Sequence, residues 1–202
     1  MPAAQDSPPE THDSIPDTKY PLPATQHTTS AEGAWAWQMT RAGYHAFVRE
    51  MFGSSSPVLK LEKDEHFLTA APLPLTVARK DDAEKTVAEP QQVPGIPING
   101  DMDVYSEGWR MEWPGAYGSG LDFIYIPGGE VFRKILRIDS PNIFSEINVV
   151  KDHPVLFNIN IAFDTDLDIY ADGNLWDSSQ AVTAQEVQFK DEDGEMQWQW
   201  RP

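Results

Sequence analysis

The stretch at 155–170, VLFNINIAFDTDLDIY, alternates apolar and polar side chains over most of its length. Its odd positions are mostly large and apolar, and its even positions include Asn158, Asn160, Asp164, Asp166 and Asp168. This period of two predicts a β-strand with one buried and one wetted face. At about 3.3 Å per residue the stretch would span about 53 Å, which is long for a strand. We therefore expect a bend or break at 164–166 and a closing turn at Asp172 and Gly173.

Further short strands separated by turn residues are predicted on both sides of this stretch. They cover 33–39, 57–62, 65–78, 109–113, 121–126, 131–138, 143–150, 186–190 and 196–200. Two pairs of them predict hairpins, one around Pro127, Gly128 and Gly129 and one at 191–194. The pattern predicts a mostly β protein, an antiparallel β-sandwich or jelly-roll-like domain.

One segment, 40–53, predicts a short helix instead. Its large apolar residues fall at helical spacing, as Tyr44, Phe47, Val48, Met51 and Phe52. Thr40 is an acceptable N-terminal cap and Gly53 a good C-terminal one.

Prolines mark the limits of the sheet. Pro72 and Pro74 lack the amide hydrogen that a ladder requires, so we expect 65–78 at a sheet edge or outside the sheet. The segment at 79–97 is first charged and then rich in proline. We interpret it as a long surface loop, with a sub-boundary of the domain as the alternative.

Residues 1–31 are rich in proline, serine and threonine and poor in large apolar side chains. Such a segment cannot bury enough surface to offset its ordering entropy, which predicts a disordered or extended arm before one domain at 32–202. Tyr20 and Leu22 are the candidate anchors on a partner protein, in a homo-oligomer or a hetero-assembly.

The charge of the chain narrows the classes of partner. The formal net charge is −17, which argues against nucleic acid and against anionic membrane surfaces as partners.

The N-terminal sequence has neither the basic nor the apolar region of a signal peptide, so we expect a soluble protein that is cytoplasmic when made. Later incorporation in a virion is compatible with this. The chain has no cysteine, which removes disulfides, thiolate nucleophiles and Cys-ligated zinc.

The acidic residues Asp164, Asp166 and Asp168 would lie on one face of a strand. Unpaired carboxylates so placed repel one another, so water, a cationic side chain or Ca²⁺ should balance them. The residues that follow do not fit an EF-hand, which leaves a non-EF calcium site or a solvated polar face.

Aromatic side chains form the second candidate site. Trp109 and Trp113, like Trp198 and Trp200, each share one face of a predicted strand, and Tyr117 lies in a turn. Exposed rings of this kind can stack on sugars, whereas a tryptophan stripe at strand spacing is typical of a core. The Tyr117 ring is expected to be the most exposed.

No pattern predicts an activated nucleophile or a phosphate-binding loop. The function expected is a non-enzymatic structural or interaction protein, a subunit of an assembly such as a virus or phage particle. A carbohydrate-binding module, with or without Ca²⁺, is the alternative, and a glycoside hydrolase with paired carboxylates is the third.

Overall fold

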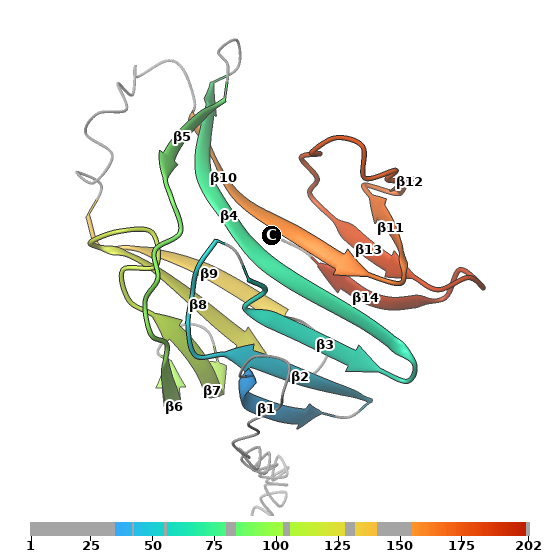
Figure 1. The fold of residues 1–202 in the computed structure, drawn as a ribbon, viewed down its shortest axis with the longest axis horizontal. Coiled ribbons are helices and arrows are strands. Elements are labelled where there is room, and N and C mark those ends of the chain that lie inside the picture. The colour runs from blue at the N-terminus through green and yellow to red at the C-terminus, as the bar shows by residue number, and fades with distance from the viewer. Residues whose placement is uncertain are drawn as a thin grey trace, which may run out of the picture.

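The computed structural model describes residues 35–200, apart from 42, 55, 80–83, 103–105, 128–131 and 141–154 (Figure 1). The predicted arm at 1–31, with Tyr20 and Leu22, and the predicted strand at 143–150 lie outside these residues.

The described residues form three antiparallel sheets. The first has the order β1-β2-β3-β4-β10 with β5 also paired to β4, the second β6-β7-β8-β9, and the third β12-β11-β13-β14. The strands are β1 (Trp35–Arg41), β2 (Tyr44–Arg49), β3 (Leu59–Lys63), β4 (His66–Arg79), β5 (Lys85–Ala88), β6 (Ile96–Met102), β7 (Ser106–Trp113), β8 (Leu121–Pro127), β9 (Phe132–Ile138), β10 (Val155–Thr165), β11 (Asp168–Ala171), β12 (Asn174–Leu175), β13 (Val187–Lys190) and β14 (Met196–Trp200). The predicted antiparallel, mostly β class is confirmed.

The prediction of a helix at 40–53 was wrong, because these residues form the β1–β2 hairpin and the segment after it. Tyr44, Ala46 and Val48 are buried in alternation along β2, which is the period of a strand. Gly43 has a φ of 89°, a conformation suited to the turn between the two strands. The helical spacing was a coincidence. It appears when only the large apolar residues are counted, and such a count omits Ala46, a small residue that is buried in the core.

Strand β4 is the central strand of the first sheet and pairs with β3, β5 and β10. It is 14 residues long, and Figure 1 shows it as a long curved strand with β10 along one side. The expectation that 65–78 would lie at an edge or outside the sheet was wrong, since β4 lies between β3 and β10. Pro72 and Pro74 are tolerated because, among the described residues, β3 pairs with β4 only up to Ala70 and β5 only from Leu75. The prolines lie in the gap between these two partners.

The prediction of a surface loop at 79–97 was wrong in part, because this segment contains β5 and the first residues of β6. Strand β5 is short and largely exposed, with Thr86 opposite Thr76 of β4.

The second sheet confirms the hairpin predicted around Pro127, as β8 and β9 pair in register from Leu121 with Ile138 to Pro127 with Phe132. Residues 121–126 are all buried, so β8 is covered on both faces. The turn at 114–120 precedes β8 as expected.

The third sheet confirms the C-terminal hairpin, formed by β13 and β14. The predicted break in the long stretch also occurs, between the end of β10 at Thr165 and the start of β11 at Asp168. Asp172 and Gly173 close the β11–β12 hairpin with positive φ at both positions, 47° and 81°. Positive φ at both central positions is the mark of a type I′ turn, and the closing turn predicted at these two residues is confirmed.

One core joins the three sheets. Phe52, which follows β2, has its ring 5.6 Å from that of Trp113 and 5.4 Å from those of Tyr117 and Phe123. Phe163 of β10 lies 5.2 Å from the rings of Phe189 and Trp200 in the third sheet. Aromatic packing therefore joins the first sheet to each of the other two.

Candidate functional site

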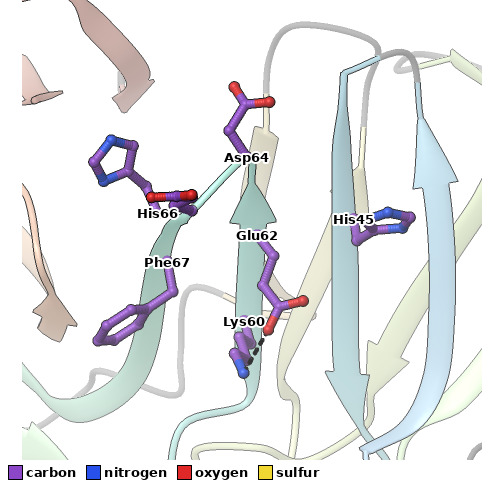
Figure 2. Close-up of a pocket in the computed structure, with 7 residues that line it drawn as sticks. His45, Lys60, Glu62, Asp64, His66 and Phe67 are labelled. Atoms are coloured by element: carbon purple, nitrogen blue, oxygen red, sulfur yellow. Dashed lines mark ion pairs between the residues drawn. The ribbon is translucent and has the colours of Figure 1, made fainter.

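A surface pocket of about 340 Å³ lies at the β3–β4 hairpin. It is lined by His45, Lys60, Glu62, Asp64, Glu65, His66 and Phe67. Figure 2 shows these side chains coming from β2, β3, β4 and the intervening turn, with His45 and His66 on either side of β3. The register explains the grouping, since Glu62 lies opposite both His45 and Phe67.

His66 connects this pocket to the end of β10. Its Nδ1 lies 2.9 Å from Oδ2 of Asp166, and the backbone N–H of Phe67 donates to Oδ1 of Asp166 at 3.0 Å. Partial burial acts to raise the pKa of Asp166, but these hydrogen bonds outweigh it and hold the pKa below its usual value. The contact clamps the β3–β4 turn to the β10–β11 junction.

The chemistry open to the pocket is limited. None of its seven lining residues is a serine, threonine or tyrosine that could be a nucleophile. Lys60 forms a salt bridge with Glu62 at 2.6 Å, and the Asp166 carboxylate orients the His66 ring. Proton transfer by His66 is one acid–base role that this arrangement suggests, and the carboxylates of Glu62, Asp64 and Glu65 line the same pocket.

The three aspartates singled out in the sequence do not converge. Asp164 is the penultimate residue of β10, Asp166 binds His66 and Phe67 in the junction, and Asp168 begins β11 opposite Lys190. Within the described parts of the chain, no group of three or more His, Asp or Glu side chains could hold a metal ion. Asp166 is thus held by hydrogen bonds with His66 and Phe67, while Asp168 lies across the strand pair from Lys190.

The five aromatic candidates are core residues. Trp109, Trp113, Tyr117, Trp198 and Trp200 are all buried. The expected exposure of Tyr117 was wrong, because the side chain is only 3% exposed and its hydroxyl donates to the carbonyl of Leu73 at 3.1 Å. A sugar platform needs an exposed ring face, which none of the five provides in this structure.

A partly buried ionic cluster in the second sheet was missed in the sequence. Arg137 donates to Asp122 at 2.5 and 3.0 Å and to Glu112 at 3.3 Å, and Arg110 donates to Glu112 at 2.6 Å. Glu112 and Asp122 are buried, and the Asp122 hydrogen bond contributes most to raising the pKa of Arg137. The only signal in the sequence was the alternation of Arg110 and Glu112 with the tryptophans of β7. A pair of carboxylates held by guanidinium groups in this way is suited to a structural role.

The outer edge of β10 is the remaining candidate. Among the described strands, β10 pairs with β4 alone and ends the order of the first sheet. Leu156 and Phe157, near its start, are 63% and 42% exposed. Exposed apolar side chains on the outer strand of a sheet are characteristic of a protein-binding edge.

No family model matches the chain, and no curated protein or solved structure matches it either. No helix in the described part of the chain is both long and apolar enough to cross a membrane.

Proposed function

We propose that this protein is a non-enzymatic subunit of a protein assembly, such as a virus or phage particle, and that it contacts neighbouring subunits. The observation that carries the proposal is the β10 edge, which ends the strand order of the first sheet among the described strands and where Leu156 is 63% exposed. Edges of this kind recruit a further strand from another chain. The N-terminal arm, with Tyr20 and Leu22, adds a second contact to a neighbouring subunit.

The position of the edge supports this role. β10 belongs to the largest sheet and also contacts the third sheet through Phe163. A strand anchored on one side by β4 and on one face by aromatic rings is a rigid template, so little ordering entropy is lost when a partner strand adds to it.

Light scattering tests the proposal by measuring the solution mass of the full chain and of a shortened chain that begins at Glu32. We expect the full chain to exceed the 22.7 kDa of one copy, and the shortened chain, which keeps β10 but loses the contact of the arm, to associate more weakly. The mass of a single copy for each version at every concentration would overturn the proposal.

A further inference from the structure

Lys134 is a partly buried lysine at the junction of the second and third sheets. It lies in β9 opposite Tyr125 of β8, a residue that is only 3% exposed. Two positions further along the strand, Leu136 shares its face of β9 and packs against the core. The Nζ atom of Lys134 lies 4.4 Å from the centre of the Trp200 ring. The side chain therefore joins β9 to β14 through a cation–π contact in largely apolar surroundings.

Two other lysines, Lys60 and Lys190, also lie over aromatic rings, with Nζ 5.8 and 4.5 Å from the ring centres. Each of them has a carboxylate as a neighbour. Lys60 forms a salt bridge with Glu62 at 2.6 Å, and Lys190 lies opposite Asp168 in the β11–β13 pair. Lys134 forms no hydrogen bond or salt bridge with any residue in the described part of the chain. Its ammonium group therefore lacks the neighbouring negative charge that the other two have.

The surroundings of Lys134 favour the neutral amine. Burial removes water from the ammonium group and lowers the pKa of Lys134 from 10.5 to about 8. At pH 7 about 10% of the side chain is then uncharged, against less than about 0.1% for an ordinary lysine. The neutral amine is the nucleophilic form, so desolvation makes this lysine more reactive than one in water.

We propose that Lys134 is a covalent attachment site for a small aldehyde, which is held as an imine against the Trp200 ring. The neutral Nζ attacks the carbonyl carbon and gives a carbinolamine. The carbonyl oxygen then leaves as water with the two protons of Nζ, and a C=N bond forms. The step consumes no oxidant or reductant. The attachment goes beyond the assembly role, because it involves neither β10 nor the N-terminal arm.

The contact with the ring favours an aldehyde over an acyl donor. An imine takes up a proton from solvent and becomes an iminium, which keeps a positive charge over the face of Trp200. Acylation of Nζ would give a neutral amide, and the cation–π contact would be lost. The imine is therefore the product that preserves the contact between β9 and β14.

Site-resolved labelling of the full native chain tests the attachment. The chain is exposed briefly to propanal at pH 7, the imines are reduced with sodium borohydride, and peptide mass spectrometry measures the label at each lysine. We expect Lys134 to be labelled at least about tenfold faster than Lys60 and Lys190, because its larger neutral fraction outweighs the lower nucleophilicity of a less basic amine. Its labelling rate should rise with a midpoint near pH 8, where an ordinary lysine is still almost fully charged.

Lys134→Arg and Lys190→Arg are matched variants, because each keeps a cation at its position. Lys134→Arg should abolish the fast label, and Lys190→Arg should leave it unchanged. Equal labelling of Lys134 and Lys190 in the native chain would overturn the proposal, and this comparison requires no variant. Faster reaction of Lys134 with an acetyl thioester, combined with equal labelling of the three lysines by propanal, would overturn the assignment to an aldehyde.

Discussion

Nδ1 of His66 lies 2.9 Å from Oδ2 of Asp166, although the two residues are 100 positions apart in the chain. The contact fixes the β3–β4 turn against the point where β10 ends and β11 begins. It therefore connects the pocket of Figure 2 to β10, the edge strand proposed to contact a neighbouring subunit.

This contact should stabilise the fold only above acidic pH. The pKa of Asp166 is lowered in the folded chain, so its contribution is complete above the unfolded value of about 3.9 and is lost as the pH falls through the lower folded value. Asp166→Asn should reduce the free energy of unfolding by about 0.5 kcal/mol at pH 7, a small effect because the side chain is about a third exposed. Urea unfolding at pH 7 and near pH 3 measures it, with Asp168→Asn as control. A deficit of the same size at both pH values would contradict this interpretation.

The ionic cluster of the second sheet predicts a larger effect. Arg137→Ala leaves the buried Asp122 with only the N–H of Gly115 as a partner and should cost about 1–2 kcal/mol of unfolding free energy, because the Arg137 side chain itself is 45% exposed. Combining Arg137→Met with Asp122→Asn removes both charges and should cost clearly less than the sum of the two single changes. Denaturant unfolding of the four proteins measures the coupling, and strictly additive costs would show that the pair does not interact.

Alanine substitutions at Met51 and Phe52, two neighbouring residues after β2, should differ sharply in their effect on stability. Phe52 is buried among three aromatic rings, so Phe52→Ala should lower the free energy of unfolding by about 3–5 kcal/mol. Met51 is 48% exposed, and Met51→Ala should change it by no more than about 0.5 kcal/mol. Thermal melting compares the two, and a similar loss in both would contradict the packing described for Phe52.

Gly95 is required by close packing. A Cβ atom there would lie 2.6 Å from Nε1 of Trp113 and 2.7 Å from the sulfur of Met111. Trp113 is held in place by its hydrogen bond to the carbonyl of Glu50, so Gly95→Ala should cost about 1–3 kcal/mol.

Gly53→Ala is the control for this change, because its Cβ would meet only the flexible side chain of Gln92 at 3.4 Å. Chemical unfolding of both variants measures the difference. Equal stability of the two would show that the backbone at Gly95 can move away from Trp113.

The sequence predicted the local elements better than their arrangement. The hairpins around Pro127 and at 191–194 were found because turn residues separate two apolar runs there. The segment containing Tyr44 and Val48 was misread because its large residues fit the helical period as well as the strand period. The hydrogen bond between Trp113 and Glu50 and the pair of His66 with Asp166 join residues 63 and 100 positions apart. No local pattern encodes such contacts, which also explains why the division into three sheets was not foreseen.

The burial of the candidate aromatic residues also depends on contacts between distant segments. Alternation shows that Trp109 and Trp113 share a face, but whether that face meets solvent depends on Phe52 and Tyr117, which other segments supply. The exposure of Phe157 was not foreseen either, because the alternation places Phe157 with the residues of the face expected to be buried.

The central claim is that β10 is an assembly edge, and light scattering over a dilution series tests it most directly. The native chain should exceed the mass of one 22.7 kDa copy as concentration rises. Leu156→Glu should associate more weakly, because it places a charge on the exposed start of the edge, whereas Val182→Glu, with the same change in charge, should behave like the native chain. A native chain that stays at 22.7 kDa, or a Leu156→Glu variant that associates as the native chain does, would contradict the assembly role of β10.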